Sequence, residues 1–295
     1  MTEYHNIIKA DPTLEGWHGY LNLVYGYRDN ETQILHQFAQ APLKVQRPFY
    51  PEGKRICHSI ILHTAGGIVG GDRVSFDIEL QPQAQALITT ATAGKIYRTN
   101  GQEAQQTINI KVAKDACLEW FPQETIVFND ARFRQDIRIE LETGASLFLW
   151  EINRFGRTAR GEKFLQGEWR SRTEIWQENR PLWIDRQQLK GSEEMWHSPY
   201  TLAGQPVIAT FTAIGQPLTP EMIAQARSIF PPSLSEGEGL KIGLTRLPDG
   251  LLCRYRGTST TDAKNWFIQL SDFLRQSCAQ YPGDQSRVWP FLRFL

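Results

Sequence analysis

A strand–turn–strand unit that recurs at intervals of about 30 residues is the feature of this sequence that most constrains its fold. The three copies read DIELQPQAQALITT at 77–90, NIKVAKDACLEWF at 109–121 and RIELETGASLFLW at 138–150. Each copy ends an alternating strand at Leu80, Val112 or Leu141, so the copies are offset by 32 and 29 residues. An alanine follows four positions later, and then a second, more apolar strand. Paired strands repeating with this period predict stacked β layers that cover each other's apolar faces.

The alternation within the strands supports the same reading. In Arg73–Leu80, apolar and polar residues alternate strictly, which is typical of a half-buried strand. The predicted fold is mainly β, an elongated helical or solenoid-like stack of β-sheets. A β-sandwich produces similar spacing between strands and turns, so the repeat alone leaves that architecture open.

The C-terminal third adds two predicted helices to this β body. Thr219–Phe230 begins with a threonine N-cap followed by proline, and Thr261–Ser277 places its large apolar residues on one face. Between them, Gly243–Tyr255 reads as a hairpin that turns at Pro-Asp-Gly. We therefore expect one domain over residues 1–295, with a β body at about 17–212 and an α+β part at about 213–295.

Composition excludes several classes of partner. Lysine plus arginine and aspartate plus glutamate both number 32, so the chain lacks the excess positive charge typical of nucleic-acid and anionic-membrane binding. The N-terminal residues do not resemble a secretory signal, and no apolar run approaches the ~20 residues that cross a bilayer. The four cysteines are far apart and form no CxxC pair. We expect reduced thiols and a cytoplasmic location.

The densest motif is HTAGGIVGGD at 63–72. It lacks the lysine and hydroxyl of a phosphate-binding P-loop and the GxGxxG spacing of a dinucleotide turn. Its four glycines, which permit positive φ angles and close backbone approach, are Gly66, Gly67, Gly70 and Gly71. A structural double turn and a functional site are both compatible with this pattern. Cys57, His63 and Asp72 could alternatively form a nickel or zinc site, because the first two share one face of a strand.

Two further segments place charged residues beside aromatic ones. LEWFPQETIVF at 118–128 contains Glu119 and Glu124, and GRTARGE at 156–162 contains Arg157 and Glu162. Charges in such surroundings either pair with each other or line a polar channel. An ion-paired surface loop is the simpler interpretation of each segment by itself.

Together these segments resemble the UreD/UreH family of urease accessory proteins. The motifs that carry the resemblance, in order along the chain, are QRPFYPE (46–52), GGIVGGD (66–72), TATAGKIYR (90–98), LEWFPQETIVF (118–128) and GRTARGE (156–162). The resemblance extends from about residue 17 to the C-terminal predicted helix.

The resemblance implies a solenoid-like β fold without enzymatic activity and without a tightly bound cofactor. It implies a complex with apo-urease, a UreF-type accessory protein and a UreG-type GTPase, in which nickel in transit crosses a polar internal passage. Asp72, Glu151 and Asp185 match carboxylate positions that the resemblance associates with that passage. Carboxylates and imidazoles suit such a cation better than a set of thiolates, which would retain it.

Two other functions compete with this one. A stand-alone metallo-enzyme would use Cys57, His63 and Asp72, although the sequence contains neither a GxSxG elbow nor an HExxH helix. A carbohydrate-binding β module would display some of the nine tryptophans as exposed stacking surfaces.

Overall fold

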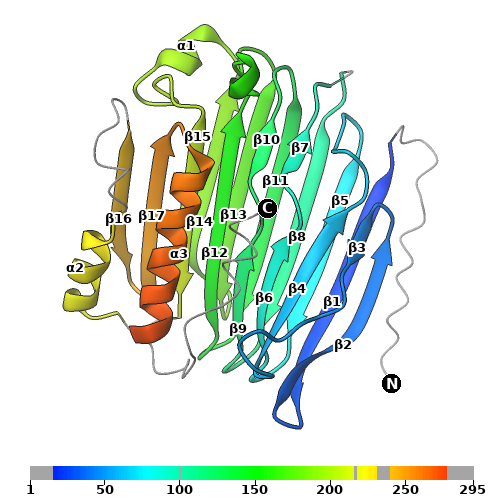
Figure 1. The fold of residues 1–295 in the computed structure, drawn as a ribbon, viewed down its shortest axis with the longest axis vertical. Coiled ribbons are helices and arrows are strands. Elements are labelled where there is room, and N and C mark those ends of the chain that lie inside the picture. Colours follow the sequence, from blue (N-terminus) through cyan, green and yellow to red (C-terminus); the bar gives the residue numbers. More distant parts are fainter. Residues whose placement is uncertain (1–15, 100, 216–217, 231–239, 278–295) are drawn as a thin grey trace.

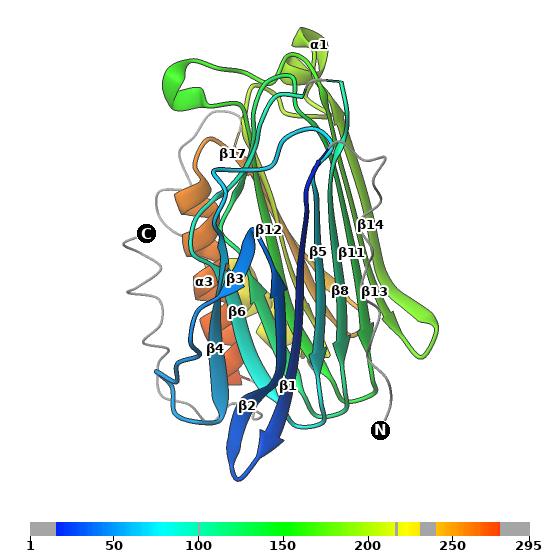
Figure 2. The same cartoon turned by 90° about the vertical axis from the view of Figure 1, so that its right-hand side faces the viewer.

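The two strands of each repeat go to two different sheets, which face each other across an apolar interior (Figures 1 and 2). A computed structural model describes residues 16–99, 101–215, 218–230 and 240–277. The first sheet, called sheet A here, has the order β14-β13-β11-β8-β5-β1-β2. The second, sheet B, has the order β16-β17-β15-β12-β9-β6-β4-β3, with β10 and β7 attached beside β12.

The strands of sheet A are β1 (His18–Arg28), β2 (Glu31–Gln40), β5 (Arg73–Leu80), β8 (Ala104–Val112), β11 (Arg132–Leu141), β13 (Glu168–Gln177) and β14 (Arg180–Lys190). The strands of sheet B are β3 (Leu43–Val45), β4 (Ile56–His63), β6 (Gln85–Thr90), β7 (Gly94–Ile96), β9 (Cys117–Phe121), β10 (Thr125–Val127), β12 (Ser146–Phe155), β15 (Val207–Ile214), β16 (Lys241–Leu247) and β17 (Gly250–Gly257).

The predicted solenoid-like stack is confirmed by the pairing between repeats. β5, β8 and β11 are parallel neighbours in sheet A, and β6, β9 and β12 are parallel neighbours in sheet B. Arg73 pairs with Gln105 and Ala104 with Phe133, so the register reproduces the offsets of 32 and 29 residues seen in the sequence. Each coil therefore contributes one strand to each sheet, whereas a hairpin-built sandwich would pair its neighbours antiparallel.

The repeated alanine marks the turn that joins the two sheets. The amide groups of Ala84, Ala116 and Ala145 each donate to the carbonyl three residues earlier, and all three side chains are buried. The residue before each alanine has a positive φ angle: Gln83, Asp115 and Gly144. A small buried residue after a left-handed one thus lets successive turns stack closely.

In the described residues, the two longer helices lie on the outer side of sheet B. α3 (Thr260–Ser277) and α2 (Pro220–Ser228) confirm the two predicted helices, and Thr219 caps α2 through its side chain. Apolar residues of α3 pack on the outward side chains of β12 and β15. Figure 2 shows the helix beside sheet B, at the left. The hairpin of β16 and β17 continues the same sheet beyond β15. No helix in the described part of the chain is long and apolar enough to span a membrane.

Two short helical segments were not predicted. They are η1 (Thr158–Arg160) and α1 (Glu193–His197), both at the upper end in Figure 1. Ser192 is the N-cap of α1: its side chain accepts a hydrogen bond from the amide of Met195, and two glutamates follow it. This cap was a visible signal, but the segment is too short to show a helical period.

A buried ion cluster fastens α3 to sheet B. The Arg275 guanidinium lies 2.9 Å from Glu119 on β9 and 3.0 Å from Glu52, and Glu52 also contacts His58 on β4 at 2.9 Å. No side chain of the four is more than 8% exposed. One guanidinium therefore serves two buried carboxyl groups, and burial raises the pKa of one of them, Glu119, to about 7.

Replacing Arg275 by methionine should lower the free energy of unfolding by about 3–5 kcal/mol, because two buried carboxylates lose their counter-charge. Urea denaturation followed by circular dichroism measures this change. The matched control is Arg246→Met, an exposed arginine without an ion-pair partner among the described residues, which should cost less than about 0.5 kcal/mol. Equal stability of the two variants would contradict the role given to Arg275.

Candidate internal polar passage

A row of polar side chains crosses the otherwise apolar space between the two sheets. Strand pairing places its members side by side: on sheet A Gln106, Gln135, Ser171 and Gln187, and on sheet B Glu151, Thr210 and Arg254. Successive coils stack in register, so inward positions at one level of the stack become neighbours. Stacking thus turns isolated polar residues into a continuous layer.

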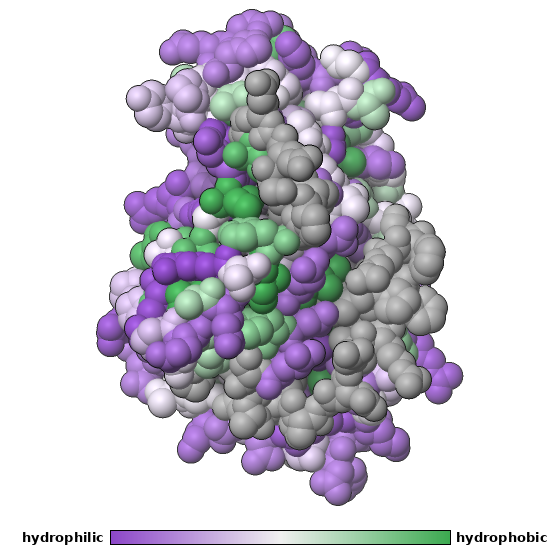
Figure 3. All heavy atoms as spheres, turned by 60° about the vertical axis from the view of Figure 1, so that its left-hand side comes forward, coloured by the Kyte–Doolittle hydropathy of each residue, from purple (hydrophilic) through white to green (hydrophobic). Residues whose placement is uncertain are grey.

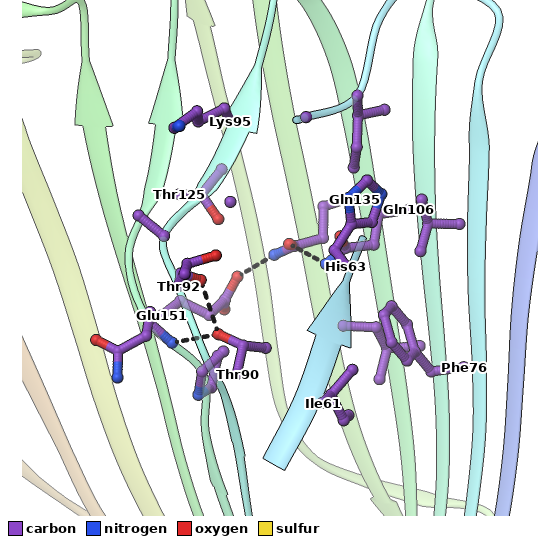
Figure 4. A pocket seen from close by; sticks show the side chains of 18 of the residues that line it. Ile61, His63, Phe76, Thr90, Thr92, Lys95, Gln106, Thr125, Gln135 and Glu151 are labelled. Atoms are coloured by element: carbon purple, nitrogen blue, oxygen red, sulfur yellow. Dashed lines mark hydrogen bonds between the residues drawn. The ribbon is translucent and has the colours of Figure 1, made fainter. Parts of the chain in front are cut away.

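Glu151 on β12 lies at the centre of this layer. One carboxylate oxygen accepts hydrogen bonds from Gln135 Nε2 at 2.5 Å and Ser171 Oγ at 3.1 Å. The other accepts one from Thr173 Oγ1 at 2.8 Å. Gln135 in turn accepts one from Gln106 at 3.1 Å. Three uncharged donors on the facing sheet therefore hold a buried carboxyl group in place. Figure 4 shows one of them, Gln135, pointing toward Glu151.

The structure brings Glu151 and Asp185 into electrostatic contact. Burial, the largest cause, raises the pKa of Glu151, and the charge of Asp185 raises it further, whereas the bonds from Thr173 and Ser171 lower it. Asp185 pairs with Arg254 at 2.8 Å, and Arg254 also donates to Thr210 at 2.8 Å. Two of the three predicted carboxylates therefore belong to one polar network.

One end of the row opens into a cavity of about 230 Å³. Gln106, Gln135 and Glu151 line it from within, and Lys95 and His63 belong to the same lining. Figure 4 shows His63 and Glu151 on opposite sides of this space. His63 Nδ1 contacts the carbonyl of Ala65 at 3.0 Å, and its buried Nε2 has no hydrogen-bond partner among the described residues. The imidazole therefore keeps one nitrogen available.

The other end of the row opens into a larger groove of about 710 Å³. Gln187, Thr210 and Arg254, the last members of the row, line it. The groove lies where sheet A ends at β14 and sheet B continues with β15, β17 and β16. The polar row thus joins two hollows on different sides of the sandwich.

Asp72 has a different setting from the other two carboxylates. It is buried and accepts hydrogen bonds from the amides of Val69 at 2.9 Å and Trp17 at 3.3 Å. It therefore fastens the glycine-rich loop to the start of β1 and is not among the residues that line the cavity. Its role in the passage stays a prediction.

The glycine-rich loop forms part of the cavity wall. Gly66 and Gly67 line the cavity, and a Cβ on Gly67 would lie only 2.6 Å from the carbonyl of Lys95. Gly70 is buried, and Gly71 has a φ of +93°. The glycines thus permit close packing of the loop on β7, which fits the predicted structural double turn.

The structure does not bring together the residues of the alternative metal site, Cys57, His63 and Asp72. Cys57 lies in the apolar interior, where burial raises the pKa of its thiol to about 11. Among the described residues, no group of three or more His, Cys, Asp or Glu side chains could hold a metal ion. Cys57, His63 and Asp72 therefore do not form one ligand set. Cys117 and Cys253 are likewise buried free thiols, and Cys278 lies outside the described residues.

The remaining predicted residues pair outside the polar row. Glu119 belongs to the ion cluster under α3, and Glu124 lies 3.4 Å from Lys264 of the same helix. Arg157 donates through Nε to Glu162 at 2.8 Å. Glu162 also accepts a bond from the amide of Asn129 at 3.1 Å. The simpler interpretation, ion pairing in a loop, is therefore correct for Arg157 and Glu162.

Sequence reasoning missed the uncharged members of the row. A signal was present, because Gln135 occupies an inward position between Phe133 and Ile137 in an alternating strand. The same holds for Ser171 and Thr173 on β13. A polar residue at an inward position can be assigned to a network only when its neighbour on the facing sheet is known. The sequence pattern alone therefore did not identify these residues.

A β-solenoid with a polar layer through its core and helices on one side is the class of protein that these features define. The family described as UreD urease accessory protein matches residues 18–290. Urease accessory protein UreD from Nostoc punctiforme is 60% identical over 93% of this chain and 96% of the relative. The corresponding protein from Trichormus variabilis is 58% identical over 94% and 97%. That from Synechocystis is 44% identical over 88% and 95%.

The chain therefore belongs to the UreD family of urease accessory proteins. Such a protein assists urease and is not itself an enzyme. The carbohydrate-binding alternative also lacks support, because the exposed large apolar side chains of the described residues include no tryptophan.

Glu151→Gln should make the stability of the protein less dependent on pH. The folded pKa of Glu151 lies above its ordinary value of 4.5, so the stabilisation from its protonated form is present below that value. This stabilisation is lost as the pH rises through the raised pKa. Urea denaturation at about pH 5 and about pH 8 should show a larger loss for the wild type than for Glu151→Gln. The exposed control Glu140→Gln should behave like the wild type, and an identical loss in all three would refute the expectation.

Proposed function

We propose that this chain is a cytoplasmic scaffold that passes nickel to apo-urease in a complex with UreF-type and UreG-type partners. The observation that carries the proposal is the row of polar side chains that joins two hollows through the interior. A soluble fold gains little stability from such a row, because apolar residues would fill the same space at lower cost. Passage of a cation through the interior would explain why polar residues occupy these buried positions.

The ligand types along the row suit a borderline dication. Carboxylate oxygens at Glu151 and Asp185 and the free imidazole nitrogen of His63 are ligands that nickel accepts, whereas the buried thiol of Cys57 stands apart from them. No three of these groups converge on one point in the described residues. A cation would therefore meet several weak positions in succession, which favours passage over retention.

The resting state of the row requires no resident metal. Glu151 is held by three donors, and burial favours its protonated form. Asp185 is balanced by Arg254. An arriving cation would take the place of the Glu151 proton and compete with Arg254 for Asp185. Each group can return to its internal partner after the cation leaves.

The double variant Glu151→Gln/Asp185→Asn tests this function. It replaces the two carboxyl groups by amides of the same shape, so the complex with the UreF-type partner and urease should form normally. Urease activation by nickel in the reconstituted complex should fall by at least about tenfold. The matched control, Glu140→Gln/Asp249→Asn, changes two exposed carboxylates and should leave activation unchanged. Full activation by an intact complex of the first variant would refute the passage.

A further inference from the structure

The groove at the β14 end of the sandwich has a one-sided charge. Its charged lining residues are Arg186, Lys241, Arg254 and Arg256, and no acidic residue is among the residues that line it. The chain as a whole has a formal net charge of zero, so this concentration of positive charge is local. Figure 3 looks at this side and shows hydrophilic and apolar residues beside each other beneath the uppermost segment.

Two of these four cations lack a partner. Arg254 is paired with Asp185, and Arg256 donates to the carbonyls of Pro199 and Thr201. Arg186 and Lys241 are exposed, and neither has an ion-pair or hydrogen-bond partner in the part of the chain that the structure describes. Unpaired cations in a concave surface attract an anionic group more strongly than the same charges on a convex surface.

The shape of the groove favours a peptide. β14 and β16 are the edge strands of the two sheets, so both sides of the groove present backbone groups to an incoming extended chain. Tyr200, in the segment that follows α1, lies at the rim and is 94% exposed. Exposed tyrosines are enriched where protein partners bind. Elsewhere on sheet A, arginines such as Arg134 and Arg172 are already paired with acidic neighbours, which disfavours a nucleic acid.

We propose that this groove is a docking site for an acidic peptide segment of a partner protein. The carboxylates of the segment would pair with Arg186 and Lys241, and its backbone would lie along the strand edges. The consequence for transit rests on the function proposed above. Arg186, Lys241 and Arg256, which have no acidic partner in the described residues, repel a dication at the mouth of the polar row, and a docked acidic segment would reduce that repulsion. Access to the row would then depend on assembly of the complex.

The test uses a fluorescein-labelled hexaglutamate peptide and fluorescence anisotropy with the full-length protein, without nickel or urease. The wild type should bind the peptide, and binding should weaken as the salt concentration rises. Arg186→Gln/Lys241→Gln should reduce the affinity by about tenfold or more. The matched control is Arg28→Gln/Lys44→Gln, which removes two exposed cations outside the groove and should bind like the wild type.

Three results would overturn the docking site. They are absence of binding to the wild type, equal loss of affinity in both double variants, and equal or tighter binding of a single-stranded DNA oligonucleotide. Because nickel is absent from the assay, these results would not contradict the proposed nickel passage. Conversely, full urease activation by Glu151→Gln/Asp185→Asn would refute the passage while peptide binding persists.

Discussion

Parallel pairing between successive coils, at offsets of 32 and 29 residues, places equivalent positions of each coil side by side. This register determines the interior between the two sheets. It stacks the buried alanines of the turns, aligns the apolar inward positions into a continuous interior, and joins Gln106, Gln135 and Ser171 into one polar row. A slip of one residue would turn the inward side chains of a strand outward, so the register is strongly specified wherever the interior is apolar.

The polar row shows how a buried carboxyl group is accommodated without a permanent counter-ion. Glu151 obtains its hydrogen bonds from an amide and two hydroxyl groups on the opposite sheet, and burial raises its pKa. Asp185, nearer the groove, has Arg254 as its counter-charge. Glu151 and Asp185 thus each have partners inside the protein, but each partner is exchangeable. That combination suits a transported cation better than a structural metal.

The outer side of sheet B follows a different principle. There the ion cluster of Glu52, Glu119 and Arg275 is closed off beneath α3 and separated from the polar row by the sheet itself. Since both carboxylates depend on a single guanidinium, this cluster fixes the position of the helix. Charged residues that look alike in the sequence therefore belong to the polar row on one face of the sheet and attach a helix on the other.

The sequence by itself determined the mainly β character, the period of the repeat, the two longer helices and the family resemblance, because these depend on local alternation, capping and long motifs. It also identified Glu151 and Asp185, though only through the family resemblance. The parallel pairing in the structure decided for a solenoid-like stack and against a hairpin-built sandwich. The tertiary structure alone decided which carboxylates meet, since Glu151 and Asp185 come from different sheets, whereas Asp72 fastens a loop and Glu119 faces a helix. The alternation of apolar and polar residues determines on which side of a strand a side chain lies. Only the packing of one sheet on the other determines which side chain of the facing sheet it meets.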